Sequence, residues 1–370
     1  MNDYLYGTRL YVNFSHLEHN IKVIRGVLNN CQTIAMVKAN AYGHGDVAMS
    51  LKMEELGINY FGVADFDEGI KLRVAGIKSD IMVMNPGSNN IETVIEYNLE
   101  PVIYNRNTLS ALKNVIIKNN SKYSKNPISI HLKINTGMNR WGFNFSEITY
   151  VIKTLQQIKG VRIKSIYSHL ASAKNMQDDN FTNNQIKKLT DYTLKFKNTF
   201  KYTIATHIYN SFGLIRFFKH HNAFDYSRIG LALYGGIKDA NFKPVSELKC
   251  LVSQIRIINK GESVGYNRSF IAKNKIKIGL IPFGYADGLQ RSWGNGMLKF
   301  KYKNQLIPTV GEISMDSCIV DLTDIKNISV SDEICYFGVD RPIWKLAEEL
   351  NTIPHEIMST LSRRIKRIYQ

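Results

Sequence analysis

Short apolar runs rich in β-branched residues recur along the first two thirds of the chain, separated by longer stretches with helical spacing of apolar positions. Strands that alternate with helices indicate parallel βαβ units. The eight runs begin at Thr33, Tyr60, Ile81, Pro101, Ile128, Ile163, Thr203 and Ser227. This number of units in roughly two hundred residues predicts an α/β fold, the (β/α)8 TIM barrel. A doubly wound open sheet is the alternative, but it usually has fewer strands, and no GxGxxG motif opens a helix here.

The alternation stops near Asp239. The later runs, such as SELKCLVSQIRIINKGESVGY and KIKIGLIPFGY, are strand-like, are broken by Gly, Asn and Pro, and have no long helices between them. We therefore expect a barrel over residues 1–238 and a smaller, mainly β domain over residues 239–370, with about the first ten residues packing on the latter. The stretch from Trp344 onward has helical spacing apart from Pro354, which predicts a closing helix.

The overall charge is strongly positive, with 48 Lys and Arg against 31 Asp and Glu and a formal net charge of +17. Such a charge is compatible with binding to nucleic acid or an anionic membrane. The lysines are spread along the chain and mixed with Asn and Ile, which indicates biased residue usage rather than a basic binding face. We expect no nucleic-acid or membrane partner, although the positive field would favour a charged substrate or a phosphate-bearing cofactor.

The four cysteines are scattered without CxxC spacing, and the nine histidines form no HExxH motif. These patterns predict reduced thiols and no metal site. The N-terminal stretch has no apolar signal core, and no run approaches the roughly 18 apolar residues of a membrane helix. We therefore expect a cytoplasmic protein.

Polar residues collect where the predicted strands end. Lys38 follows the first apolar run, His169 follows the sixth, Asn210 and Ser211 follow the seventh, and Arg140 lies in the loop after the fifth. Active sites of parallel barrels form at the C-terminal ends of the strands. These residues therefore form a candidate site, with the Lys38 amine as its candidate nucleophile.

The segment AMVKANAYGHG (Ala35–Gly45) resembles the site at which alanine racemases attach pyridoxal 5′-phosphate. Further similar segments follow in the family's order: INTGMNRWGF, YSHLASA, YNSFG, RIGLALYGG, VGYNRSF, PFGYADGLQR and VGEISMDSCIVDLT. The resemblance covers nearly all 370 residues. It implies a racemase that interconverts L- and D-alanine with pyridoxal phosphate and supplies D-alanine for peptidoglycan.

The resemblance also implies a role for individual residues. Lys38 matches the lysine that binds the cofactor and transfers a proton on one face of the substrate, and Tyr266 matches the second base, which comes from the partner subunit of a homodimer. The residues that match cofactor contacts are Lys38, Tyr42, His169, Asn210, Ser211, Arg228 and Gly230. Those that match substrate contacts are Arg140, Met315 and Tyr285, with the Met315 amide from the partner. Arg228 matches the residue facing the ring nitrogen, to which a guanidinium donates without giving up its proton.

Four positions differ from the family or vary within it. Arg363 stands where many members carry a tyrosine that touches the phosphate, and Glu312 stands in place of an arginine. Asn135 stands where many members carry an aspartate. Lys133 matches a lysine that is carbamylated in some members, and an unmodified lysine is equally compatible with the sequence.

Three other functions remain open from the sequence. A barrel racemase acting on another amino acid would share all of these residues. A basic amino-acid decarboxylase of the same architecture would use a cysteine near Met315, for which Cys318 is the candidate, but the Tyr266 segment favours racemisation. A cofactor carrier without turnover would need no second base, and the appended β domain that bears Tyr266 argues against it.

Overall fold

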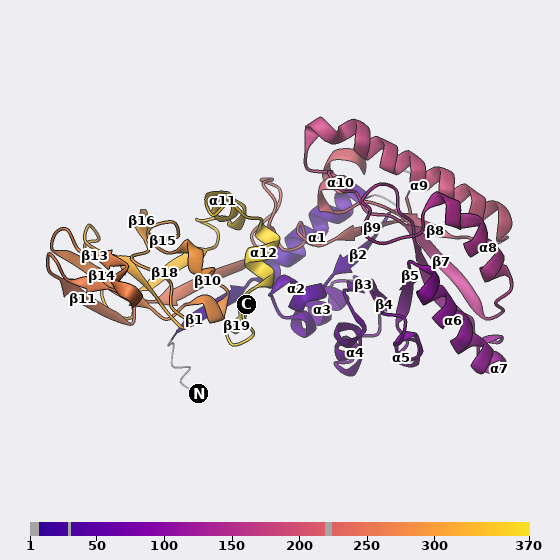
Figure 1. Ribbon diagram of the computed structural model, residues 1–370, viewed down its shortest axis with the longest axis horizontal. Coiled ribbons are helices and arrows are strands. Elements are labelled where there is room, and N and C mark those ends of the chain that lie inside the picture. The colour runs from indigo at the N-terminus through magenta and orange to yellow at the C-terminus, as the bar shows by residue number, and fades with distance from the viewer. Residues whose placement is uncertain (1–6, 29–30, 219–223) are drawn as a thin grey trace. The chain divides into compact units, whose positions relative to one another are not determined.

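The chain divides into two compact units (Figure 1) in the computed structural model, which describes residues 7–28, 31–218 and 224–370. The β unit comprises the chain up to Ile21, Tyr42–Gly45 and Leu231–Gln370. The barrel unit comprises Lys22–Ala41 and Asp46–Gly230. Residues 1–6, part of the segment expected to pack on the β domain, lie outside the described residues.

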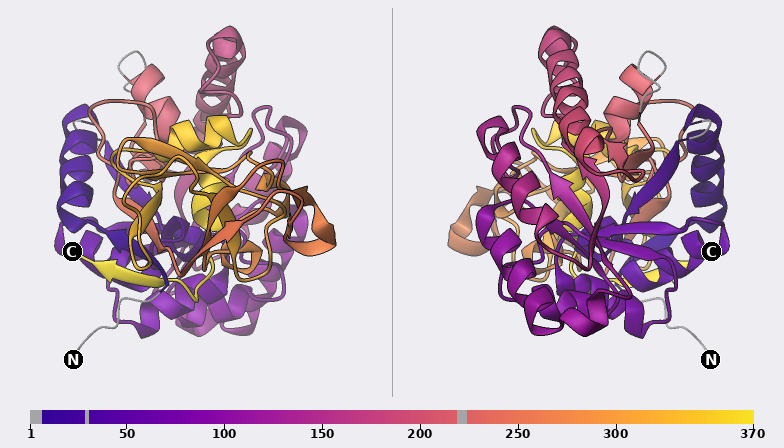
Figure 2. Two further views of the ribbon diagram at one scale, coloured as in Figure 1. Left: turned by 90° about the vertical axis from the view of Figure 1, so that its left-hand side faces the viewer. Right: turned by 90° about the vertical axis from the view of Figure 1, so that its right-hand side faces the viewer.

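Eight parallel strands close into a barrel, because the first of them pairs with the last (Figure 2, right). The eight-stranded barrel predicted from the apolar runs is thereby confirmed. Its strands are β2 (Gln32–Met36), β3 (Tyr60–Val63), β4 (Asp80–Val83), β5 (Glu100–Ile103), β6 (Ile128–Lys133), β7 (Val161–Tyr167), β8 (Ala205–His207) and β9 (Tyr226–Ile229).

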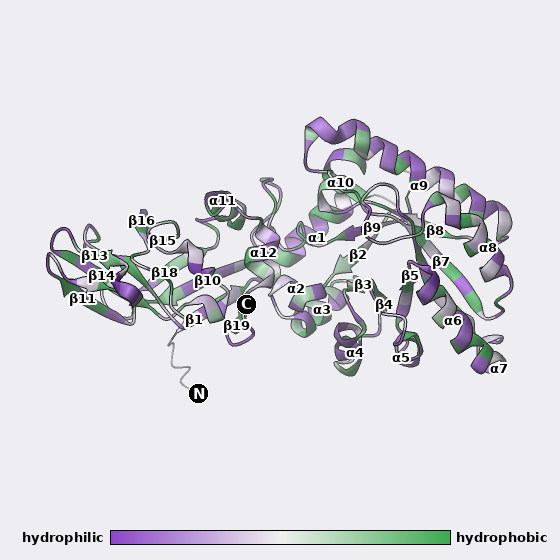
Figure 3. Ribbon diagram, viewed as in Figure 1, coloured by the Kyte–Doolittle hydropathy of each residue, from purple (hydrophilic) through white to green (hydrophobic). Residues whose placement is uncertain are grey.

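Helices connect these strands along the chain. They are α1 (Phe14–Leu28), α2 (Lys38–Tyr42), α3 (Asp46–Glu55), α4 (Phe66–Val74), α5 (Ile91–Glu96), α6 (Arg106–Lys118), α7 (Asn120–Tyr123), α8 (Ile148–Gln156), α9 (Asp179–Thr199) and α10 (Ser211–Phe217). Along α9 the buried positions Ile186, Leu189, Thr193 and Phe196 recur every three or four residues, which gives one inward face. Figure 3 shows this as alternating apolar and polar colours along that helix.

The barrel strands are buried over almost their whole length, as expected for a parallel sheet covered by helices. Their interior is not uniformly apolar. His131 of β6, Ser165 of β7 and His207 of β8 are completely buried inside it. Barrel interiors are usually filled by branched aliphatic side chains, so these three polar residues require partners within the core.

The β unit contains three sheets. A six-stranded sheet has the order β16-β15-β18-β10-β1-β19, a three-stranded sheet the order β11-β14-β17, and β12 pairs with β13. The bounds are β1 (Thr8–Val12), β10 (Ser246–Leu251), β11 (Gln254–Ile258), β12 (Ser263–Val264), β13 (Phe270–Ile271), β14 (Ile276–Ile281), β15 (Lys299–Tyr302), β16 (Gln305–Pro308), β17 (Cys318–Asp321), β18 (Glu333–Phe337) and β19 (Lys366–Tyr369).

The C-terminal stretch is helical only in part. It forms α11 (Ile343–Glu349) and, after a break before Pro354, α12 (Pro354–Ser359). The prediction of a closing helix is wrong for the last residues, which form β19. Lys366–Tyr369 pairs in parallel with β1 in the six-stranded sheet, so sheet pairing overrides the helical spacing of the sequence.

The segment Tyr42–Gly45 is fastened to the β unit by its histidine and its two glycines. His44 is buried and contacts the Tyr42 carbonyl through Nδ1 (2.9 Å) and the Ser246 hydroxyl through Nε2 (2.8 Å). Gly43 has a φ of +81°, and a Cβ there would lie 2.0 Å from the Met358 carbonyl oxygen. The histidine between the glycines is therefore an anchor of the chain rather than a group exposed for chemistry.

Within the described residues, no helix is both long and apolar enough to cross a membrane. No group of three His, Cys, Asp or Glu side chains suited to a metal ion occurs among those same residues.

We predict that Gly43→Ala destabilises the β unit by about 2–4 kcal/mol. Alanine is strained at the left-handed φ of Gly43, and its Cβ would overlap the Met358 carbonyl oxygen. Gly261→Ala is the matched control. Gly261 has a φ of +88° but nothing within 4 Å of an added Cβ, so its cost is about 1 kcal/mol from the backbone alone. Urea unfolding measures both variants, and equal losses would contradict the steric role of Gly43.

Candidate active site

Lys38 lies two residues beyond β2, at the start of a strained turn. Ala39, Asn40, Ala41 and Tyr42 have φ values of 52°, 55°, 51° and 53°, so the segment α2 is a left-handed turn made without glycine. Each left-handed residue with a Cβ costs about 1–2 kcal/mol. Strain of this kind persists only where the surroundings fix the backbone, and it concentrates at functional sites.

Glu68 of α4 holds this turn. One carboxylate oxygen accepts from the Ala39 backbone N–H at 2.6 Å, and the other accepts from the Ala64 N–H at 2.7 Å. Burial raises the pKa of the Glu68 carboxyl, while these two backbone donors oppose the rise. Nothing in the sequence marks Glu68, because an acidic residue in the first turn of a helix is ordinary.

Lys38 is exposed overall but lies among other cations. Partial desolvation and the positive charges of Arg140 and Arg228 lower the pKa of the Lys38 amine, and the Glu68 carboxylate partly offsets them. A lowered amine pKa increases the share of the neutral, nucleophilic form at neutral pH. The structure therefore brings Lys38, Arg140 and Arg228 to the same end of the barrel, as the sequence predicted.

A second lysine belongs to this group. Lys133, at the end of β6, is 4 % exposed, and burial together with the charges of Arg228, Arg140 and Lys38 lowers its pKa to about 7. Its Nζ lies 5.1 Å from the centre of the Trp141 ring and 5.7 Å from that of Tyr167. The site thus holds two amines of lowered pKa, of which Lys133 is partly neutral near pH 7.

The loop that bears Arg140 is organised by Asn135. The Asn135 side chain accepts from the N–H groups of Gly137 and Asn139, both at 3.1 Å, and donates to the Asn144 side chain at 3.0 Å. An asparagine therefore shapes this loop where many relatives carry an aspartate. The Arg140 guanidinium is exposed and stacks on Trp141 at 5.2 Å.

Arg228 is buried and held mainly by neutral acceptors. Its Nη1 donates to His207 Nδ1 through a short contact, and its Nη2 donates to the Ser168 carbonyl (2.6 Å) and to His169 Nδ1 (3.1 Å). Its guanidinium carbon lies 4.7 Å from the centre of the Tyr167 ring. Burial lowers its pKa to about 10, so it remains charged at neutral pH.

Both histidines beside Arg228 are neutral. Burial and the charge of Arg228 lower the pKa of His169 and that of His207 well below the usual range. The sequence predicts His169 at the site, and in the structure its Nδ1 contacts Arg228. The sequence does not mark His207 or Tyr167 as part of the site, although the Tyr167 ring stacks on His207 at 4.7 Å.

Asn210, Ser211 and Gly230 follow β8 and β9. The Asn210 side chain accepts from the Gly213 N–H at 2.9 Å and so caps α10, whose first residue is Ser211. Asn210 also lines a cavity of about 450 Å³, whose lining does not include Lys38, Arg140 or Arg228. Its other lining residues are Leu170, Ala171, Ser172, Ala173, Lys174, Asn175 and Phe212. This volume suits a small ligand at the strand ends.

The other predicted residues belong to the β unit. Tyr42 is buried and stacks on Tyr234 at 4.9 Å, and burial raises the pKa of its hydroxyl to about 12. Tyr266 lies between β12 and β13 and is 71 % exposed. Tyr285 and Met315 are also exposed and lie on adjacent loops, because the Tyr285 N–H donates to the Ser314 carbonyl and the Ala286 N–H to that of Met315.

The departures from the family pattern have local explanations in part. Glu312 pairs with Arg291 at 2.5 Å, so the acidic replacement has a basic partner within the β unit. Arg363 is exposed, whereas the adjacent Arg364 pairs with Asp287 (2.6 Å) and Asp316 (2.8 Å).

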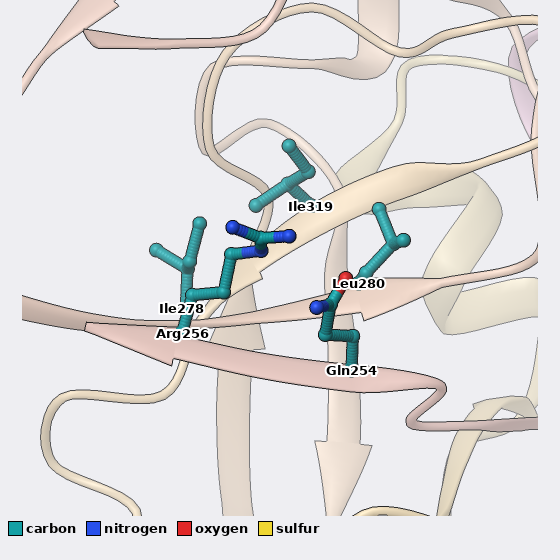
Figure 4. Close-up of a pocket in the computed structure, with 5 residues that line it drawn as sticks. All are labelled: Gln254, Arg256, Ile278, Leu280 and Ile319. Atoms are coloured by element: carbon teal, nitrogen blue, oxygen red, sulfur yellow. The ribbon is translucent and has the colours of Figure 1, made fainter. Parts of the chain in front are cut away.

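A second hollow, of about 100 Å³, lies in the β unit on the sheet β11-β14-β17 (Figure 4). Gln254 and Arg256 project from the same side of β11, and Ile278, Leu280 and Ile319 complete the lining. It contains none of the predicted site residues.

The barrel residues fit pyridoxal phosphate by their chemistry. The Lys38 amine, with its lowered pKa, can bind an aldehyde covalently, and the surrounding cations favour the phosphate and a substrate carboxylate. Arg228 supplies a charged donor for a ring nitrogen, and the hydroxyl of Ser211 lies at the start of a helix.

Comparison with known proteins agrees with this reading. Residues 12–238 match the family model "Alanine racemase, N-terminal domain", and residues 245–369 match "Alanine racemase, C-terminal domain". The alanine racemase of Helicobacter pylori (strain HPAG1) is 33% identical, over 97% of both chains. An amino-acid racemase of Enterococcus faecalis is 31% identical over 96% of this chain and 50% of its own length.

A solved structure of the Bartonella henselae alanine racemase, with covalently bound pyridoxal phosphate, superposes with a TM-score of 0.86 at 28% identity. The match covers 98% of this chain and 99% of that one. Both the family models and the full-length relatives thus lead to one conclusion: the chain belongs to the alanine racemase family.

Proposed function

We propose that this protein interconverts L- and D-alanine with pyridoxal 5′-phosphate as its cofactor and supplies D-alanine for peptidoglycan. The observation that carries the proposal is the Lys38 amine at the C-terminal end of the barrel, whose pKa is lowered by partial desolvation and by the charges of Arg140 and Arg228. Such an amine can both bind the cofactor aldehyde and act as a base near neutral pH.

The division of labour follows from the residues. When bound, pyridoxal phosphate delocalises the negative charge that develops at the substrate Cα after proton loss. Lys38 would hold the cofactor, and its amine would move a proton at one face of Cα. Tyr266 of the partner subunit moves a proton at the opposite face, so that removal and return on different faces invert the configuration.

Arg228 orients the cofactor ring and keeps the ring nitrogen from gaining a proton, because a guanidinium donates a hydrogen bond without releasing its proton. Tyr42, His169, Asn210, Ser211 and Gly230 complete the cofactor site. The charge of Arg140 attracts the substrate carboxylate, aided by the Met315 amide of the partner subunit and by Tyr285 at the entrance.

The proposal includes a homodimer with shared sites in the cytoplasm, and a barrel domain of residues 1–238 followed by a β domain of residues 239–370. The exposure of Tyr266 and Met315 supports the shared sites. The base Tyr266 and the carboxylate contact Met315 can act only if a ligand reaches them. Tyr266 lies in the exposed β12–β13 hairpin, which is well suited to reach a second subunit.

The burial of Cys318 argues against a decarboxylase. Cys318 is 1 % exposed, and burial strongly raises the pKa of its thiol, which makes it a poor proton donor to a ligand. Racemisation of a different amino acid shares the same proton chemistry, so substrates must be compared directly.

We expect the purified protein to racemise L-alanine, measured by loss of optical rotation, in a reaction that depends on pyridoxal phosphate. Lys38→Ala should abolish the visible absorbance of the lysine-bound cofactor and lower the rate by at least about 10²-fold. Lys345→Ala, which removes an exposed lysine, is the control. Much faster racemisation of serine or lysine than of alanine would contradict the assignment of alanine as the substrate. Full activity in Lys38→Ala would contradict the role of Lys38 in the mechanism.

We expect Tyr266→Phe to retain the cofactor but to lose about 10²–10⁴-fold in racemisation rate, because one of the two bases is missing. Mixing unfolded Lys38→Ala and Tyr266→Phe chains and refolding them together tests the shared site. A heterodimer then has one site with both native residues, so roughly a quarter of the wild-type activity should return. If each site used a single chain, the mixture would stay inactive.

We expect Lys133 to bind carbon dioxide as a carbamate, with release of one proton, increasingly as the pH rises through about 7. The sign follows because only the neutral amine reacts, and burial and neighbouring cations make the amine neutral at lower pH than in water. ¹³C NMR with labelled bicarbonate measures the carbamate between pH 6 and 8. Lys133→Gln is the control, and an equal signal in that variant would assign the carbamate elsewhere.

A further inference from the structure

A chain of buried hydrogen bonds runs through the barrel interior to Arg228. His207 Nε2 contacts the Ser165 hydroxyl at 2.8 Å, and that hydroxyl contacts His131 Nδ1 at 2.7 Å. On its other side, His131 Nε2 contacts Glu100 Oε2 at 3.1 Å. All three of Ser165, His131 and His207 are completely buried, so none of these contacts can be replaced by solvent.

We propose that Ser165, His131 and Glu100 are positioning residues that orient Arg228 by fixing which nitrogen of His207 accepts its hydrogen bond. The effect on the reaction rests on the proposed function, because Arg228 is there the residue that orients the cofactor. The hydrogen-bond chain itself stands on the contacts of the barrel unit alone.

The direction of each hydrogen bond follows from Arg228. A guanidinium can only donate, so His207 Nδ1 must accept and the ring proton must lie on Nε2. That Nε2–H then donates to Ser165, and the Ser165 hydroxyl donates to His131 Nδ1. His131 in turn carries its proton on Nε2, which faces the Tyr60 oxygen at 2.8 Å and Glu100 Oε2 at 3.1 Å, while Tyr60 itself donates to Glu100. The tautomers of the two histidines are thus coupled to the position of Arg228, because a His207 ring protonated on Nδ1 would offer the guanidinium no acceptor.

The far end of the chain is a carboxylate held in its ionised form. Glu100 Oε2 also accepts from the Tyr60 hydroxyl at 2.6 Å, and Oε1 pairs with Lys164 at 2.6 Å. Burial alone would raise the pKa of Glu100, but donation from His131 and the charge of Lys164 hold it at about 2. An ionised carboxylate can only accept, so it imposes the same direction on the chain from the opposite end.

Arg228 at one end and Glu100 at the other require the same direction for every hydrogen bond between them. This shared direction distinguishes the hydrogen-bond chain from polar groups that are buried near one another by chance. If His131 were protonated on both nitrogens, the Ser165 hydroxyl would receive two donors and its own proton would lack an acceptor in this chain. Burial lowers the pKa of His131, against the effect of Glu100, and keeps it neutral. Among the described residues, Glu100, His131, Ser165, His207 and Arg228 have no buried side-chain nitrogen or oxygen that lacks a hydrogen-bond partner.

The arrangement also leaves the charge of Arg228 without a direct carboxylate partner. A carboxylate in contact would offset that charge in an ion pair, whereas here Glu100 is separated from the guanidinium by His131, Ser165 and His207. Arg228 therefore gains an oriented acceptor without an ion pair. Its charge remains available to the ligand at the end of the barrel, where the electrostatic effect is strongest in a dry site.

Two substitutions affect the chain differently. Ser165→Ala interrupts it, so His207 loses the acceptor that holds its proton on Nε2. Glu100→Gln can place an amide N–H against His131, which reverses every donor along the chain and turns a His207 N–H toward Arg228. Ser227→Ala is the matched control, because Ser227 is also a fully buried barrel serine, but its hydroxyl contacts Cys31 at 3.3 Å and lies outside the chain.

The test uses the holoprotein of each variant with ¹⁵N-labelled histidine. We expect the wild type and Ser227→Ala to show His207 as one tautomer, protonated on Nε2, with the signal assigned by difference from His207→Asn. Ser165→Ala should show a mixture of tautomers, and Glu100→Gln should shift His207 toward Nδ1 protonation. This measurement does not require turnover, so it separates a failure of the chain from a failure of the proposed function.

The second readout is the split between kcat and KM for alanine. We expect Ser165→Ala to lower kcat by about tenfold with little change in KM, since the carboxylate contact of Arg140 is untouched, and Glu100→Gln to lower kcat further. The proposal would be overturned by a single His207 tautomer in Ser165→Ala, or by a loss of thermal stability with kcat unchanged. Either result would show that Ser165, His131 and Glu100 serve only the packing of the core.

Discussion

The electrostatic constraint on which the structure depends is the gathering of cations at one end of the barrel. Lys133 and Arg228 are buried there beside the more exposed Lys38, and the charge of Arg140 acts on both lysines. Buried like charges repel strongly, and protein sites relieve this by shifting pKa values or by binding anions. The lowered pKa of the two lysines is the first response. The second response is the binding of an anionic cofactor and substrate. The repulsion between these cations therefore favours ligand binding at this end of the barrel.

Much of this could be predicted from the sequence, because strand ends are visible in it. Eight apolar runs predict the barrel, and the barrel then brings Lys38, Arg140, His169 and Arg228 to one end even though they are up to 190 positions apart. The family resemblance adds the role of each residue. The β domain was predicted as a class but not in its topology, since β1 and β19 pair across almost the whole chain and no local pattern encodes that pairing.

The supporting residues could not be predicted, for different physical reasons. His131, Ser165 and Glu100 lie inside β-strands, where a polar residue is read as facing outward or as an isolated exception. Only the closed barrel shows that they meet. His44 stands in the most conspicuous motif of the chain, yet it serves as an anchor, because its two ring nitrogens are engaged by Tyr42 and Ser246.

The left-handed turn connects these observations. Four consecutive residues carry the cost of a positive φ, so the backbone after Lys38 would relax if it were not held at both ends. Glu68 holds the beginning through the Ala39 N–H, and the contacts of His44 hold the end. A lysine on a flexible loop would lose conformational freedom each time it bound the cofactor or took a proton. A lysine on a backbone already fixed loses less, and the strain is the cost of that preorganisation.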